Sequence, residues 1–257
     1  MTRVSVKVIS LSGSSDRRAV ISKSLESFEF QWAFFDALSG DSRGDLIYDE
    51  GCALRYFGRP LSGNEIGCFK SHYTVLKNFI NEEASEWMIV FEDDLLIDTK
   101  FDYGALIAYL SESGIDCLRL YCRRWKAADV VGYYYYRQLL RFRTDPYGIQ
   151  SYIINKRAAS AILANIRDIR RPIDDEIGRF WEHGVRIIGL FPFPVLETSA
   201  ASTLQASRLE ASRRTPTRLS DHAARLLLRS LDKVGKTTYN VIYPIFPRII
   251  IPQMLRG

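Results

Sequence analysis

Three consecutive acidic residues follow directly after an apolar run. The run from Trp87 to Phe91 contains no polar side chain, and Glu92, Asp93 and Asp94 come immediately after it. Carboxylates repel one another and are costly to place beside a buried strand, so a bound cation commonly compensates them. A hard divalent ion such as Mn2+ or Mg2+ takes oxygen ligands and can bridge to substrate phosphates. The triplet therefore predicts a metal site, and the alternative is a solvated turn at a strand end.

The segment upstream of the triplet has the pattern of a helix that leads into this strand. Ser62 and Glu65 have the spacing of a capping box. Apolar residues then recur at helical spacing, at Ile66, Phe69, Tyr73, Leu76 and Ile80. A helix, then a buried strand, then acids is the usual layout of an α/β enzyme whose site lies at the carboxyl end of a strand.

The rest of the chain continues this alternation. Further strands are predicted over residues 4–11, 30–35, 117–121, 131–142, 147–154 and 185–188. Further helices are predicted from residue 14 and over residues 101–110, 156–166 and 172–181, with residues 41–60 as a long loop or small insert. The alternation predicts a three-layer α/β domain with a mostly parallel sheet.

The charge is unevenly distributed along the 257 residues. Residues 205–257 hold ten Lys and Arg against three Asp and Glu, whereas the preceding 204 residues hold 25 against 27. We therefore predict a near-neutral catalytic domain over residues 1–204 and a basic segment over residues 205–257. A body without positive excess argues against nucleic-acid binding, which needs cations on the folded surface. The four cysteines have no CxxC spacing, which disfavours a zinc site or a disulfide framework.

Four blocks of the sequence, taken in order, resemble the glycosyltransferase family 25 enzymes, the lipooligosaccharide galactosyltransferases of Gram-negative bacteria. The first block comprises residues 8–11, 16–18, 35–37 and Gly40, and the second comprises residues 61–72. The third is Ile89-Val90-Phe91-Glu92-Asp93-Asp94, and the fourth comprises residues 147–154, Ala158 and 172–174. Together the blocks span residues 4 to 190, and the basic tail lies outside the resemblance.

The resemblance implies a GT-A type fold and the transfer of a hexose, galactose from UDP-galactose, to a lipooligosaccharide or related glycan acceptor with inversion. It makes the acidic triplet the counterpart of an Asp-x-Asp metal motif, with Asp94 as the first metal ligand. Glu92 would point to the same side as Asp94 in an extended segment and is the second ligand. Glu92 or Asp93 would otherwise bind the ribose. The remaining residues assigned to the nucleotide are Ser10, Asp16, Arg17 and Asp36.

Inversion requires a base that accepts the proton of the attacking hydroxyl. Asp174, which follows Pro172, is the first candidate, and Asp175 and Glu176 are the alternates. An acid at this position also favours the dipole at a helix N-terminus, so a purely structural role is equally compatible with the sequence.

The basic tail has an apolar stripe at helical spacing. Its members are Leu219, Ala223, Leu226, Leu227, Ser230, Leu231 and Val234, accompanied by Arg218, Arg225, Arg229, Lys233 and Lys236. Such a helix favours an anionic membrane surface. Without a predicted signal peptide or transmembrane run, we expect a cytoplasmic protein that is peripheral on the inner membrane, where a lipid-linked oligosaccharide acceptor is made. The alternative is a helix that packs on the body.

Two other functions compete with glycosyl transfer. A metal-dependent phosphohydrolase also places acids at a strand end, but it would need further Asp, His or Lys ligands in the same cluster. A non-catalytic glycan-binding protein on a glycosyltransferase scaffold is the second alternative, and the intact acids argue against it. Neither the donor sugar nor the acceptor follows from the sequence alone.

Overall fold

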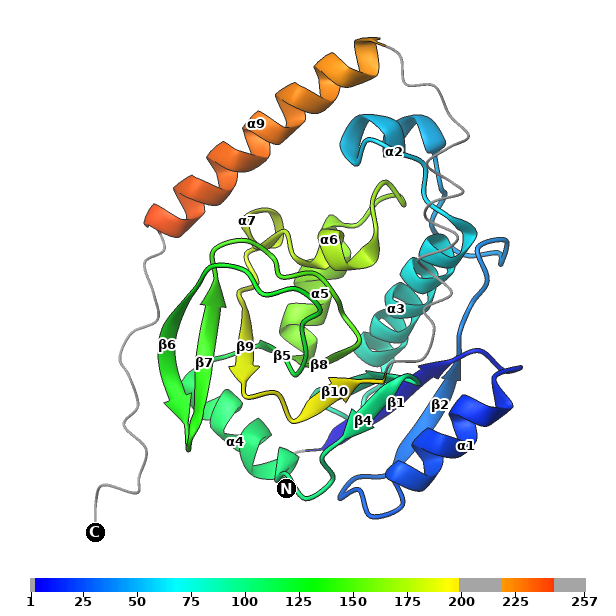
Figure 1. The fold of residues 1–257 in the computed structure, drawn as a ribbon, viewed down its shortest axis with the longest axis vertical. Helices are drawn as coiled ribbons and strands as arrows, with labels where there is room; N and C mark the ends of the chain where they lie inside the picture. The colour runs from blue at the N-terminus through cyan, green and yellow to red at the C-terminus, as the bar shows by residue number, and fades with distance from the viewer. Residues whose placement is uncertain (1–2, 199–218, 243–257) are drawn as a thin grey trace.

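A computed structural model of the protein describes residues 3–198 and 219–242 (Figure 1). In these ranges the main sheet has eight strands, in the order β2-β1-β3-β8-β5-β9-β7-β6. The strands of this sheet are β1 (Val4–Ser10), β2 (Trp32–Asp36), β3 (Trp87–Glu92), β5 (Cys117–Arg119), β6 (Ala128–Tyr134), β7 (Arg137–Phe142), β8 (Ser151–Asn155) and β9 (Ile187–Phe191). A second, two-stranded sheet pairs β4 (Leu95–Ile97) with β10 (Val195–Glu197). The helices are α1 (Ser15–Ser24), α2 (Glu50–Tyr56), α3 (Gly63–Asn81), α4 (Tyr103–Ser113), α5 (Lys156–Asn165), α6 (Ile173–Ile177), α7 (Phe180–His183) and α9 (Leu219–Ile242).

The sheet separates two hydrophobic cores, which confirms the predicted three layers. Alternate side chains of a strand point to opposite faces. Accordingly, Met88 and Val90 of β3 join the core formed with α3 and α5, whereas Ile89 and Phe91 join the core formed with α1 and α4. Strand β3 is thus buried on both faces, and Glu92, its last residue, is only partly buried.

The prediction of a mostly parallel sheet was wrong, because the sheet is mixed. Three of its strand pairs are parallel, β1 with β2, β1 with β3, and β5 with β9. The other four pairs, β3 with β8, β5 with β8, β6 with β7 and β7 with β9, are antiparallel. Strand β8 lies between β3 and β5 and is buried on both faces. Full burial produces the same continuous apolar pattern whichever way a strand runs, so the pattern does not reveal its direction.

Local signals predicted the helices near the site well. Ser62 and Glu65 form the expected capping box at the start of α3. The predicted insert at residues 41–60 contains α2, whose N-cap Asp49 accepts a hydrogen bond from the backbone N–H of Cys52. The predicted helix at residues 172–181 is divided into α6 and α7, and Gly178 ends the first of them.

Helix α9 lies beside α2 and α7 (Figure 1) and packs on them through its polar side. Arg179 of the body forms an ion pair with Asp232, and the Tyr239 hydroxyl donates to the Gly184 carbonyl at 2.9 Å. The apolar stripe faces outward: the side chains that are 58–68% exposed are Leu226, Leu227, Leu231, Val234 and Val241. No helix in the described ranges is long and apolar enough to span a membrane. Residues 199–218, which include the predicted domain boundary between residues 204 and 205, lie outside the described residues.

Candidate functional site

The acidic triplet occupies a tight turn at the carboxyl end of β3. Glu92 is the last residue of β3, and Asp93 and Asp94 form the turn that precedes β4, so the segment is not extended as expected. The Asp94 carbonyl accepts hydrogen bonds from the Thr198 backbone N–H at 2.8 Å and from the Thr198 hydroxyl at 2.9 Å. The turn is therefore held by the end of β10.

Asp94 has the properties of a cation ligand. Burial, followed by the neighbouring charges of Glu92, Glu197 and Asp93, raises the pKa of Asp94 to about 7. Its Oδ1 atom is buried and has no hydrogen-bond partner among the described residues. A buried carboxylate oxygen without a donor, surrounded by other acids, fits a hard divalent cation such as Mn2+ or Mg2+. The charge of Glu92 acts on Asp94, so both carboxylates belong to the same acidic cluster at the end of β3.

The Asp93 carboxylate contacts the end of β1 and the first turn of α1. The Ser10 hydroxyl donates to Asp93 at 2.7 Å, and Arg17 donates to it at 3.3 Å. Arg18 in turn donates to the Ser10 carbonyl at 2.9 Å. The carboxyl ends of the parallel neighbours β1 and β3 therefore bring Ser10, Arg17 and Asp93 together, as expected of residues assigned to one nucleotide site.

The two other nucleotide candidates are more exposed. Asp36, at the end of β2, is paired with Arg18, and its side chain is 70% exposed. Asp16 lies in the exposed first turn of α1 and forms no hydrogen bond or ion pair with the part of the chain that the structure describes. The geometry brings Asp36 to the edge of the cluster and leaves Asp16 outside it.

Glu92 also contacts a buried histidine. The Nε2 atom of His72 lies 3.2 Å from a carboxylate oxygen of Glu92, and its Nδ1 atom lies 3.2 Å from the Tyr152 hydroxyl. Cys68 lies one helical turn before His72. Three atoms that could bind a metal lie within 4.8 Å of one another, one each from Cys68, His72 and Glu92. This sulfur, nitrogen and oxygen set is softer than the ligands of Mn2+ or Mg2+. We therefore regard His72 chiefly as the residue that orients Glu92.

The predicted base lies across a small cavity from Glu92. Asp174, in the first turn of α6, accepts hydrogen bonds from the backbone N–H of Gly148 at 3.1 Å and from that of Asp175 at 3.0 Å. Asp174, Glu92 and Arg123 line this cavity together. The structure thus brings the predicted base and a predicted metal ligand to one opening.

The two alternates for the base face elsewhere. Asp175 lines a second, larger cavity, and burial raises the pKa of its carboxyl group. Glu176 is 4% exposed and forms an ion pair with Arg170 at 3.2 Å. A buried carboxylate held by a guanidinium stabilises the fold and is poorly placed to accept a substrate proton.

Sequence reasoning missed two residues of the site, Arg123 and Glu197. They form an ion pair with each other, and the Tyr121 hydroxyl donates to Glu197 at 2.9 Å. The negative charges of Glu92 and Asp94 help to raise the pKa of Arg123, so its guanidinium lies close to the triplet. The available signal was weak: Arg123 follows shortly after the strand predicted over residues 117–121, and Glu197 lies beyond the last predicted strand.

Comparison with known proteins identifies the family of the chain. The model of glycosyltransferase family 25, described as an LPS biosynthesis protein, matches residues 4–177. The chain therefore belongs to glycosyltransferase family 25.

The curated relatives are much longer proteins. Procollagen galactosyltransferase 1-A of Xenopus laevis is 33% identical over 103 residues, which is 37% of this chain and 17% of that protein. Human procollagen galactosyltransferase 2 is 30% identical over 101 residues, 37% of this chain and 16% of that protein. A Bos taurus relative at 31% identity over 103 residues, 37% of this chain and 17% of that protein, is named a probable inactive family member. The chain thus matches about a sixth of the length of these relatives.

Among solved structures, a glycosyltransferase involved in glycosylation of the major capsid of PBCV-1 aligns with a TM-score of 0.44 and 10% identity. This alignment covers 83% of this chain and all of that one. A197 from STIV aligns with a TM-score of 0.43 and 12% identity, over 76% of this chain and 83% of that one.

Proposed function

We propose that the protein is an inverting, metal-dependent glycosyltransferase with a GT-A type fold, which moves galactose from UDP-galactose to a hydroxyl of a lipooligosaccharide or related glycan. The observation that carries the proposal is the buried, unpartnered oxygen of Asp94 in an acidic turn that lies beside the cavity of Asp174. Family membership supports transfer of a sugar over the hydrolysis of a phosphate ester.

Each part of the site has a task in this reaction. A bound divalent ion would neutralise the charge that develops on the departing diphosphate. Asp94 and Glu92 would hold that ion, and Asp93, fixed by Ser10 and Arg17, would orient the nucleotide. Asp174 would accept the proton of the acceptor hydroxyl. The two backbone N–H groups that donate to Asp174 keep its carboxylate in place.

The direct test is the release of UDP from a panel of UDP-sugars, with glycan acceptors, in the presence of Mn2+ and in excess EDTA. We expect turnover with UDP-galactose and Mn2+, and its loss in EDTA. Full turnover in EDTA would refute the metal role. Release of inorganic phosphate instead of UDP would favour a phosphohydrolase, and UDP-sugar binding without any turnover would favour a non-catalytic glycan-binding protein.

We further propose that the protein is cytoplasmic and binds the inner membrane peripherally through α9. The support is the outward apolar stripe of this helix, because a helix that only covered the body would turn its apolar side inward. The exposed cation Lys233 lies on the same helix and suits an anionic lipid surface.

Vesicle sedimentation tests this proposal. The full chain should sediment with vesicles of equal phosphatidylglycerol and phosphatidylcholine, and less so at high salt. The double variant Leu227→Ser with Leu231→Ser should bind at least tenfold more weakly. Ile47→Ser, which changes a 76% exposed residue of the body, is the matched control and should bind like the wild type. Equal sedimentation of the double variant would contradict the proposal.

A further inference from the structure

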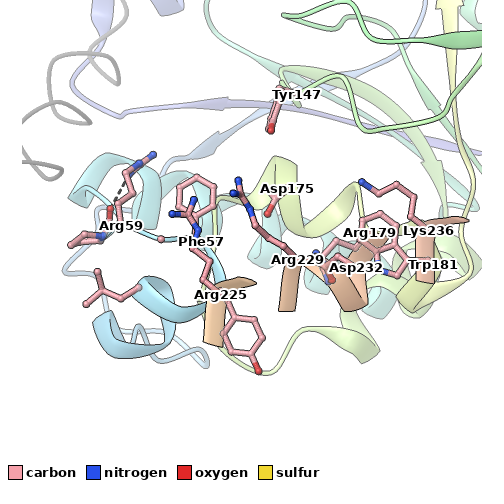
Figure 2. A pocket seen from close by; sticks show the side chains of 14 residues that line it. Phe57, Arg59, Tyr147, Asp175, Arg179, Trp181, Arg225, Arg229, Asp232 and Lys236 are labelled. Atoms are coloured by element: carbon pink, nitrogen blue, oxygen red, sulfur yellow. Dashed lines mark hydrogen bonds and ion pairs between the residues drawn. The ribbon is translucent and has the colours of Figure 1, made fainter. Parts of the chain in front are cut away.

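A cavity of about 570 Å3 lies between α2, α7 and α9, and the catalytic steps described above do not use it. Its walls combine aromatic and cationic side chains (Figure 2). They include Phe57, Tyr147 and Trp181, and three cations of α9, Arg225, Arg229 and Lys236. Aromatic rings can pack on the apolar faces of a sugar, while guanidinium and ammonium groups bind phosphate or carboxylate. The composition of the cavity therefore suits a sugar that carries negative charge.

The acids that line this cavity already have cationic partners. Asp232 is bound by Arg179, which is itself 5% exposed. Asp175 lies 3.5 Å from the Nε atom of Arg171, a fully buried guanidinium. Both acids thus have a cationic partner in the body, and of the three cations of α9 their charges act on Lys236.

The cations of α9 are not paired in this way. Arg225 and Arg229 are one helical turn apart, and neither forms an ion pair within the described ranges. The Nε atom of Arg225 is buried without a hydrogen-bond partner in that part of the chain. Burial, followed by the charge of Arg229, lowers the pKa of Arg225. Two neighbouring guanidinium groups in a partly buried wall repel each other, and an anion bound between them would offset that cost.

The backbone opposite α9 is adapted to one of these cations. Gly58, at φ +94°, has no side chain, and the Arg225 guanidinium occupies the space that a Cβ atom there would fill. Lys236 lies over the Trp181 ring at 4.7 Å, which leaves its ammonium group facing the cavity (Figure 2). These close fits hold Arg225 and Lys236 at the wall of the cavity.

The first turn of α6 joins this cavity to the catalytic centre. Asp175 lines the large cavity, whereas Asp174, the residue before it, lines the small cavity together with Glu92 and Arg123. The two cavities therefore meet at neighbouring residues of one helical turn, with Glu92 at the small cavity and the cations of α9 at the large one. A group bound there would approach the base from the side of the acceptor.

From this arrangement we infer that the cavity binds the acceptor by an anionic substituent, a phosphate or carboxylate carried on one of its sugars, which Arg225, Arg229 and Lys236 hold. The inference rests on the proposed function for its assignment to the acceptor, but the anion site itself is defined by these cations. It predicts that the enzyme selects negatively charged glycans over neutral ones.

Isothermal titration calorimetry of the full chain with galactose 6-phosphate, galacturonic acid and galactose tests the inference. We expect galactose 6-phosphate or galacturonic acid to bind at least tenfold more tightly than galactose, and the tighter of the two identifies the preferred anion. The double variant Arg225→Gln with Arg229→Gln should lose at least tenfold in affinity for that ligand. Lys233→Gln removes one exposed cation of the same helix that does not line the cavity, and should change the affinity less than twofold.

Titration of UDP with Mn2+ separates this site from the donor site. UDP affinity should be unchanged in the double variant, and its loss would overturn the assignment to the acceptor side. Equal binding of charged and neutral sugars, or an unaffected double variant, would also overturn the inference.

Because the double variant relieves repulsion between two guanidinium groups, we expect it to fold, and its thermal midpoint verifies this. The single variant Lys236→Gln provides a second, independent measurement. Anion binding without sugar transfer would uphold the site and refute only the proposed function.

Discussion

Replacement of Asp94 by Asn should stabilise the metal-free protein at alkaline pH, and the effect can be calculated from the environment of this carboxylate. The pKa of Asp94 is raised from 3.8 to about 7, mainly by burial and then by the charges of Glu92 and Glu197. A raised acid pKa contributes stability that is fully present below pH 3.8 and is lost as the pH rises through 7. Each pKa unit corresponds to about 1.36 kcal/mol, so the full loss is about 4 kcal/mol.

The assay is urea unfolding of wild type and Asp94→Asn in EDTA, followed by circular dichroism at pH 5 and at pH 8. Relative to the protein below pH 3.8, ionisation of Asp94 lowers the unfolding free energy of the wild type by about 1.7 kcal/mol at pH 5 and by about 4 kcal/mol at pH 8. The variant has no such titration. The difference in unfolding free energy, variant minus wild type, should therefore grow by about 2.5 kcal/mol between the two pH values.

A matched variant controls for the general loss of negative charge. Asp16→Asn removes an exposed acid outside the cluster, and its difference from the wild type at each pH measures the effect of losing one negative charge. If the difference for Asp94→Asn stays constant, the carboxylate is not held among uncompensated acids, and the argument for a cation at this turn fails.

Three further predictions concern the base, the partly buried His183 and metal linkage. Asp174→Asn should lower kcat by about a hundredfold or more while UDP affinity by calorimetry stays unchanged, and turnover within a few-fold of wild type would move the base elsewhere. Burial lowers the pKa of His183 from 6.5 to about 4, so its stabilising contribution, present above pH 6.5, is lost as the pH falls. Between pH 7 and pH 4.5, urea unfolding of the wild type should lose about 2.5 kcal/mol more than that of His183→Gln, and parallel losses would argue against a neutral, partly buried imidazole. Mn2+ at a hundred times its Kd should stabilise the wild type by about 2.7 kcal/mol, and Asp94→Ala should abolish this shift in thermal melts.

The parts of the site that are contiguous in sequence could be predicted from it. The acidic triplet directly follows its buried strand, and the capping box of Ser62 and Glu65 is formed within a single helical turn. Such features depend on neighbouring residues alone. The same holds for the apolar stripe of α9, which follows from helical periodicity.

The remaining parts depend on contacts between distant segments. Glu197 reaches Arg123 because β10 pairs with β4, and nothing in either short strand signals that pairing. The direction of β8 was missed because burial on both faces conceals it. Periodicity predicted which residues form the apolar side of α9. It did not predict that the polar side would pack on the body, where Asp232 pairs with Arg179.

The most direct test of the account is the calorimetric titration of UDP into the wild-type protein with Mn2+ and with EDTA, repeated for Asp94→Ala. In the proposed mechanism a divalent ion held at the acidic turn would bind the diphosphate. We therefore predict that UDP binds at least tenfold more tightly with Mn2+ than with EDTA, and that Asp94→Ala removes this difference. Equal UDP affinity in EDTA, or an undiminished Mn2+ effect in Asp94→Ala, would contradict it.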